Sequence, residues 1–244
     1  LLRVARLMRE RTETIATAIT LEQGKPLDAS RAEVSRAASF LDWDAAQLQR
    51  SYGRIIPTDP EVEQRVVVEP VGPVAAFTPW NVPISAPARK ISGAIAAGCS
   101  VIIKPAEETP AAACLLAQCF LDAGLPNGAL NVLFGDPATI SARLIGSPVI
   151  RMVTLTGSVA VGKRLTHLAA EGMKPVLMEL GGHAPVLIDA DVDPLAVARL
   201  AAAAKFRIAG QLCVSPSRFL VHEAVYEPFV RAFAEAAAAL KVGD

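Results

Sequence analysis

Residues 74–104 read VAAFTPWNVPISAPARKISGAIAAGCSVIIK, and they predict a strand, a helix and a second strand in succession. The strand segments Val74–Phe77 and Ser100–Ile103 are short and apolar, and a helix near Pro87–Ala97 lies between them. Short apolar strands joined by one helix are typical of a parallel sheet that helices cover on both faces. This stretch therefore predicts an α/β fold.

The same alternation continues on the carboxyl side. The expected strands are Ala129–Leu133, Met152–Leu155, Val176–Glu179, Ala184–Ile188 and Phe219–Val221, and the expected helices are Pro110–Ala123, Gly162–Glu171, Pro194–Ala204 and Tyr226–Leu240. Residues 1–50 read as helices that break at Gly24-Lys25-Pro26, and Arg54–Glu69 reads as a β-hairpin. The whole pattern predicts a doubly wound parallel sheet with a protruding hairpin arm.

Composition excludes several classes of protein. The 244 residues carry 24 basic and 24 acidic side chains, so there is no electrostatic footprint for nucleic acid or an anionic membrane. The longest uncharged stretches are too short to span a bilayer, and no secretory signal is visible. Four cysteines and three histidines lack metal-ligand spacing, which favours a reduced, cytoplasmic protein without a metal. The first residue is Leu1, inside a helical pattern, so we expect the chain to be a fragment.

Five segments combine reactive side chains with turn-forming residues. TPWN (78–81) and IKPAE (103–107) each follow an expected strand, and LTGSVAVG (155–162) leads from a strand into a helix. MELGGHAP (178–185) places Glu179 at a strand end, and AGQLCVSPSR (209–218) places Cys213 in a connecting segment. Taken in order with LEQGKPL near the start, these motifs resemble the aldehyde dehydrogenase superfamily over essentially the whole chain.

The resemblance implies a catalytic role for three residues. A cysteine thiolate can attack an aldehyde carbonyl, and the adduct can lose hydride to leave a thioester. Cys213 would be this nucleophile, Asn81 would hold the developing oxyanion together with a backbone N–H, and Glu179 would activate the water that hydrolyses the thioester. The alternative for any cysteine is a small buried hydrophobe, and we expect Cys99, Cys114 and Cys119 to be buried in this way.

The resemblance also implies a nicotinamide cofactor and a domain division. Its binding residues would be Thr78, Trp80, Lys104, Glu107, Gly157, Ser158, Gly162 and Leu180. A carboxylate at Glu107 would repel a 2′-phosphate, so NAD is expected in preference to NADP. Residues 1–53 and 70–182 would form the NAD-binding domain, residues 54–69 an oligomerisation hairpin, and residues 183–244 the N-terminal part of a truncated catalytic domain. The partner would be a second copy, in a homodimer or homotetramer.

Two arginines refine the expected substrate. Arg89 and Arg207 match positions at which succinate-semialdehyde dehydrogenases hold the distal carboxylate of the substrate, and a guanidinium suits bidentate carboxylate binding. An ω-semialdehyde acid is therefore the first substrate class. One alternative is an enzyme for uncharged aldehydes, in which both arginines are structural. Another is a non-catalytic NAD-binding relative, which Ile208 favours because the family has asparagine at this position.

Overall fold

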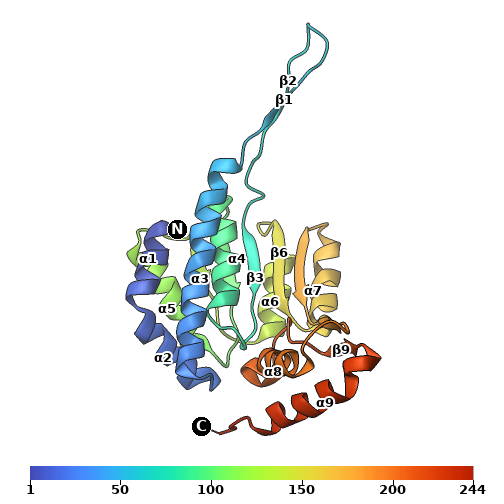
Figure 1. The fold of residues 1–244 in the computed structure, drawn as a ribbon. Helices are drawn as coiled ribbons and strands as arrows, with labels where there is room; N and C mark the ends of the chain where they lie inside the picture. Colours follow the sequence, from blue (N-terminus) through green and yellow to red (C-terminus); the bar gives the residue numbers. More distant parts are fainter. Residues whose placement is uncertain (244) are drawn as a thin grey trace. The chain divides into compact units, whose positions relative to one another are not determined.

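The computed structural model describes residues 1–243, and these divide into two compact units between Glu179 and Leu180. Unit 1, Leu1–Glu179, contains a helical N-terminal segment, a hairpin and a five-stranded sheet with its own helices (Figure 1). Unit 2, Leu180–Asp244, contains a two-stranded sheet with two α-helices. The α/β class predicted from the strand and helix alternation is confirmed.

Unit 1 begins with three α-helices and a short 3-10 turn. They are α1 (Leu2–Glu10), α2 (Thr12–Gln23), α3 (Leu27–Gln47) and η1 (Leu48–Arg50). The predicted break at Gly24 is present, and Gly24 has φ 76°, a left-handed conformation that glycine adopts without a steric penalty. A second break lies at Arg11, where φ is −101°. The helical segment before Gly24 is therefore divided into two helices, α1 and α2.

The predicted hairpin follows these helices. β1 (Arg54–Ile56) pairs antiparallel with β2 (Gln64–Val66), and Figure 1 shows the pair extending away from the sheet of unit 1. Its apolar side chains face solvent: Ile55 is 74% exposed and Val67 is 70% exposed. Contiguous exposed apolar side chains of this kind mark a surface that another chain or segment covers.

The central sheet of unit 1 has the strand order β5-β4-β3-β6-β7. Its strands are β3 (Val74–Phe77), β4 (Val101–Lys104), β5 (Leu130–Val132), β6 (Met152–Gly157) and β7 (Val176–Leu180). The connecting helices are α4 (Ser85–Ala96), α5 (Pro110–Asp122), α6 (Pro137–Gly146) and α7 (Val159–Glu171). β3 pairs parallel with both β4 and β6. β4 and β5 are added on one side of β3, and β6 and β7 on its other side, so the strand order reverses between β3 and β6. Right-handed crossovers then place α4 and α5 on one face and α6 and α7 on the other, as in a doubly wound sheet.

The sequence analysis did not predict α6. Its signal is an N-cap aspartate followed by proline at the first helical position. Asp136 Oδ1 accepts a hydrogen bond from Thr139 N at 2.7 Å, and the hydrogen bonds from Thr139 hold the pKa of Asp136 below its usual value. The helix is only ten residues long, so its apolar periodicity is weak.

The largest core of unit 1 lies between the sheet and the helices α1 to α5. All four residues of β3 are buried, as expected for a strand that is covered on both faces. Met8, Ile91, Leu116 and Phe120 are at most 1% exposed and belong to the same apolar cluster. Burial of each such side chain stabilises the fold by about 1.5–3 kcal/mol.

Unit 2 is a small parallel pair with two helices. β8 (Pro185–Ile188) pairs with β9 (Arg218–Val221), and α8 (Pro194–Lys205), η2 (Arg207–Gly210) and α9 (Glu223–Ala238) complete it. Four phenylalanines, Phe206, Phe219, Phe229 and Phe233, form a cluster with ring centroids 5.2–6.1 Å apart. Aromatic contacts at these separations supplement the small aliphatic core around Ile188.

The turn before Cys213 has unusual backbone geometry. Ile208 has φ 50° and ψ 43°, and Ala209 has φ 52° and ψ 31°. The left-handed region is unfavourable for L-residues, most of all for β-branched ones, whereas asparagine enters it more readily. Ile208 therefore holds local strain that an asparagine would reduce.

We predict that Ile208→Asn stabilises the protein. Relief of the left-handed strain contributes about 1–2 kcal/mol, partly offset by lost apolar burial at this half-buried position. Thermal unfolding of the intact protein would register a higher Tm. Val214→Asn is the matched control, because it makes the same type of change in the same segment without a positive φ. An equal rise in both variants, or a fall for Ile208→Asn, would contradict the strain argument.

Candidate active site

The motif segments lie at the carboxyl ends of the strands of the central sheet. Phe77 of β3 is in register with Lys104 of β4 and with Leu155 of β6, so these three strands end at nearly the same level. The segments at these strand ends are Thr78–Asn81, Lys104–Glu107 and Gly157–Ser158, and Glu179 and Leu180 are the last two residues of β7. β3 and β6 flank the point at which the strand order reverses, and ligands bind there, beyond the carboxyl ends of the strands.

The segment after β3 contains a polar atom that lacks a partner. Thr78 is 7% exposed, and its Oγ1 has no hydrogen-bond partner among the described residues, while its backbone N–H donates to Lys104 O at 3.3 Å. Trp80 is 37% exposed, and Asn81 is half-buried. A buried hydroxyl without a partner is costly, so Thr78 is suited to bind a polar ligand group.

The segment after β4 holds a lysine and a carboxylate together. Lys104 is buried, forms an ion pair with Glu107, and donates to Pro105 O at 3.1 Å. The Glu107 side chain is 43% exposed, so its carboxylate is accessible from solvent. This arrangement offers a charged donor and an acceptor side by side, which suits the hydroxyl groups of a ribose.

The segment after β6 begins α7. The Ser158 hydroxyl accepts from Val161 N at 3.3 Å and therefore caps the helix. Gly157 lies at the end of β6, and Gly162 is buried in the first turn of α7, where its N–H donates to Ser158 O at 2.9 Å. A helix amino terminus favours an anionic ligand group. The glycine motif thus contributes Gly157 and Ser158 to the exposed end of the helix, whereas Gly162 lies inside it.

A lysine that the sequence pattern did not reveal lies near the carboxyl end of β7. Lys90 on α4 donates to Thr154 Oγ1 at 2.8 Å, and Thr154 Oγ1 donates to Leu177 O at 3.0 Å. The pKa of Lys90 is lowered to about 8, mainly by burial; the Glu179 carboxylate partly opposes this shift, and the Arg89 charge adds to it. Glu179 therefore lies within electrostatic reach of an amine that titrates near neutral pH. The only sequence signal was the position of Lys90 in the apolar helix that follows the Asn81 segment.

The predicted nucleophile lies in unit 2. Cys213 is exposed in the connecting segment after η2, whereas Cys99 and Cys119 are buried, and burial raises the pKa of Cys119. The expectation that Cys114 is buried is wrong, because it faces outward on α5. Ser215 anchors the segment after Cys213, since its hydroxyl donates to Lys205 O at 3.0 Å.

The two predicted substrate arginines are both exposed. Arg207 lies in η2 of unit 2. Arg89 lies on α4 of unit 1, and its guanidinium carbon is 4.4 Å from the centroid of the Phe40 ring on α3. A cation–π contact of this kind orients the guanidinium before it binds an anion. Phe40 is a second residue that the sequence did not reveal.

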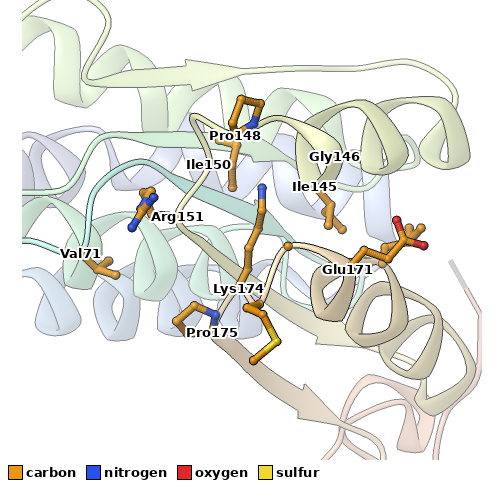
Figure 2. Close-up of a pocket in the computed structure, with 12 residues that line it drawn as sticks. Val71, Ile145, Gly146, Pro148, Ile150, Arg151, Glu171, Lys174 and Pro175 are labelled. Atoms are coloured by element: carbon orange, nitrogen blue, oxygen red, sulfur yellow. The ribbon is translucent and has the colours of Figure 1, made fainter.

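A cavity of about 690 Å³ lies elsewhere in unit 1. Arg151, Glu171 and Lys174 are among its lining residues, and they precede β6, end α7 and precede β7, respectively (Figure 2). The cavity is thus at the amino ends of these strands, opposite the edge that carries the motif segments. Lys174 donates its ammonium proton to Ser147 O, so this cation already has a backbone partner.

Within residues 1–243 no helix is both long and apolar enough to cross a membrane. The same residues contain no group of three or more His, Cys, Asp or Glu side chains placed to hold a metal ion.

Comparison with known proteins identifies the family. The model of the aldehyde dehydrogenase family matches residues 1–244. The chain is 50% identical over 241 residues to the putative 4-(hydroxymethyl)benzenesulfonate dehydrogenase TsaD2 of Comamonas testosteroni, covering 98% of the chain and 50% of that protein. It is 46% identical over 237 residues to the mitochondrial succinate-semialdehyde dehydrogenase of Arabidopsis thaliana, covering 95% of the chain and 44% of that protein.

A solved structure shows the same architecture. The structure described as an E. coli NADP-dependent enzyme superposes with a TM-score of 0.95 at 39% identity, over 100% of the chain and 52% of that structure. The chain spans about half the length of the curated relatives that it matches. From its motifs, its doubly wound sheet and these matches, the chain belongs to the aldehyde dehydrogenase family.

Proposed function

We propose that the intact protein oxidises an aldehyde to a carboxylic acid with NAD, and that its substrate is an ω-semialdehyde acid such as succinate semialdehyde. The observation that carries this proposal is the position of four motif segments at the carboxyl edge of one parallel sheet. These are Thr78–Asn81, Lys104–Glu107, Gly157–Ser158 and Glu179–Leu180. Membership of the family supports aldehyde oxidation with NAD or NADP.

The residues at this edge fit a dinucleotide. Thr78 Oγ1 offers a buried hydroxyl that has no partner among the described residues, and the amino end of α7 at Ser158 offers backbone donors to a phosphate. Trp80, Gly157 and Leu180 would complete the binding surface, with Gly162 buried in the helix behind it. When bound, the nicotinamide cofactor supplies the hydride acceptor for the oxidation.

NAD in preference to NADP is a finer proposal that rests on Glu107. Its carboxylate is accessible and pairs with Lys104 in the segment that would meet the adenosine ribose. A second negative charge, on a 2′-phosphate, would be repelled by this carboxylate. The similar structure described as NADP-dependent makes this choice a matter for experiment.

The chemistry assigns one task to each catalytic side chain. Cys213 Sγ forms a bond to the carbonyl carbon, and Asn81 donates to the oxygen that receives the carbonyl π electrons. Loss of hydride from that carbon leaves a thioester on Cys213. Glu179 then removes a proton from water as the water oxygen bonds to the carbon, the C–S bond breaks, and the thiolate leaves.

The substrate class rests on Arg89 and Arg207. Arg89 is oriented by Phe40 and Arg207 is exposed, so each can offer a fork of donors to a distal carboxylate. The two curated relatives described above are named for substrates with an anionic group, a sulfonate in one and a carboxylate in the other. If the arginines are structural, the same catalytic residues serve uncharged aldehydes.

The hairpin and the boundary between the two units bear on the domain division and on the oligomeric state. We propose that residues 54–69 are an oligomerisation arm in a homodimer or homotetramer, because Ile55, Val67 and Val68 expose apolar side chains there. Residues 1–53 and 70–182 would then be the NAD-binding domain, and residues 183–244 the first part of the catalytic domain. Cysteine usage without metal spacing supports a reducing, cytoplasmic location.

The first test follows reduced-cofactor absorbance with the intact protein. NAD and NADP are each combined with succinate semialdehyde and with propanal. We expect the pair of NAD and succinate semialdehyde to have the highest kcat/KM, by roughly tenfold or more over any other pair, equivalent to about 1.4 kcal/mol. Equal values for NAD and NADP would remove the role of Glu107, and inactivity with every pair would favour a non-catalytic relative.

A second test separates acylation from thioester hydrolysis. Cys213→Ala should abolish the pre-steady-state burst of reduced cofactor. Glu179→Gln should retain a burst and lower the steady-state rate by roughly 10²–10⁴-fold, because only hydrolysis needs the base. Glu171→Gln, an exposed carboxylate at the opposite edge of the sheet, is the control and should change neither phase. A full steady-state rate in Glu179→Gln would exclude Glu179 as the base.

A third test addresses the arginines. Arg89→Leu and Arg207→Leu should each raise KM for succinate semialdehyde by roughly 10- to 100-fold, since a charge-assisted hydrogen bond contributes about 1.5–3 kcal/mol. KM for propanal should stay within about twofold. Arg36→Leu, at an exposed arginine on α3, controls for the loss of a surface charge. Equal effects on both aldehydes would assign Arg89 and Arg207 to structure.

A further inference from the structure

A buried ion pair joins Lys25 and Glu33 in unit 1. Their side chains are only 2% and 5% exposed, respectively, and the Lys25 ammonium donates directly to Glu33 Oε2. Removing two charges from water is costly, so such a pair persists only where further hydrogen bonds satisfy both groups. The position of those further bonds shows what the pair holds.

Within the part of the chain that the structure describes, the other hydrogen bonds of the two charged groups all end on one short segment, residues 81–85. Lys25 Nζ donates to Asn81 O at 3.2 Å. Glu33 Oε1 accepts from Ile84 N at 3.2 Å and from Ser85 N at 3.1 Å. The pair therefore binds both ends of this segment, which lies between β3 and the first turn of α4.

The sequence of the segment explains why it needs an external partner. Ile84 is the N-cap of α4, and an apolar side chain cannot accept from the free N–H groups of the first turn. Glu33, from α3, supplies the acceptor and places a negative charge at the amino end of α4. This carboxylate thus replaces a local cap and joins two helices.

Lys25 itself is held in a defined position. Gly24 ends α2 in the left-handed region, with φ 76°, and Pro26 begins α3 with φ −53°. A glycine turn and a proline on either side restrict the path of the backbone at Lys25. The motif QGKP, residues 23–26, therefore directs one lysine to the Asn81 segment.

We propose that Lys25 and Glu33 are positioning residues for Asn81. They fix the backbone at the Asn81 carbonyl and at Ile84 and Ser85 just beyond it, so that the Asn81 amide meets the oxyanion without reorganisation during the reaction. This inference rests on the proposed function, in which Asn81 is the oxyanion donor. An apolar pair could fill the same space, but it could not bind the Asn81 carbonyl and two N–H groups.

The experiment uses the intact protein with NAD and succinate semialdehyde. The double variant Lys25→Met/Glu33→Gln removes both charges together, so neither is left buried alone. We expect the rate constant of the reduced-cofactor burst to fall roughly 10- to 100-fold, the effect of a misplaced catalytic group, with little change in the Kd for NAD. The burst amplitude counts the folded, active sites, so partial unfolding lowers the amplitude and leaves the rate constant unchanged.

Two comparisons complete the test. Glu13→Gln/Arg31→Met removes an exposed ion pair between α2 and α3, the helices on either side of the Lys25 turn, and should leave the burst rate constant unchanged. In an Asn81→Ala background, Lys25→Met/Glu33→Gln should cause no further loss, because both act through the same amide.

The outcomes separate the inference from the function on which it rests. A normal rate constant with a reduced amplitude, or an additional loss in the Asn81→Ala background, overturns the positioning role. An unchanged burst rate constant in Asn81→Ala alone overturns the oxyanion role of Asn81, and the positioning inference with it. A loss confined to the Asn81-containing protein supports both.

Discussion

The parallel pairing of β3 with β4 on one side and β6 on the other is the constraint on which unit 1 depends. Because parallel strands share one direction, the segments that follow them emerge at one edge of the sheet. Crossovers of a single hand then send the connecting helices to opposite faces. The result is a layered unit in which the apolar core lies against the sheet and the polar motif residues lie along its carboxyl edge.

Buried polar groups hold the motif segments at that edge in defined positions. Lys25, Glu33 and Lys104 are almost fully buried, and each forms hydrogen bonds to backbone groups in or beside a motif segment. Isolated buried charges would destabilise the fold, whereas these charges have hydrogen-bond partners and hold the backbone of the segments that they contact. Lys90 is a further partly buried cation, since burial lowers its pKa to about 8 while Thr154 Oγ1 accepts a hydrogen bond from it. The chemistry of this edge is thus built from helix residues as well as from loop residues.

Unit 2 depends on different interactions. Its core is small, and a cluster of phenylalanines around Phe219 and Phe233 supplements the apolar contacts of α8 and α9. The turn that leads to Cys213 has two non-glycine residues in the left-handed region. Strained backbone of this kind persists where the surrounding structure holds it, and such places concentrate at functional sites. Ser215 contributes by anchoring the segment after Cys213 to the end of α8.

The sequence by itself determined the fold class, the order of the motifs along the chain, the hairpin and the family, because apolar periodicity and short motifs are local properties. It missed α6, whose ten residues carry little periodic signal, and it wrongly assigned Cys114 to the interior. Only the tertiary structure decided that Lys25 and Glu33 hold the Asn81 segment and that Lys90 lies near Glu179. These contacts join residues roughly 50 to 90 positions apart. Their energies depend on burial and on partners that no local pattern records.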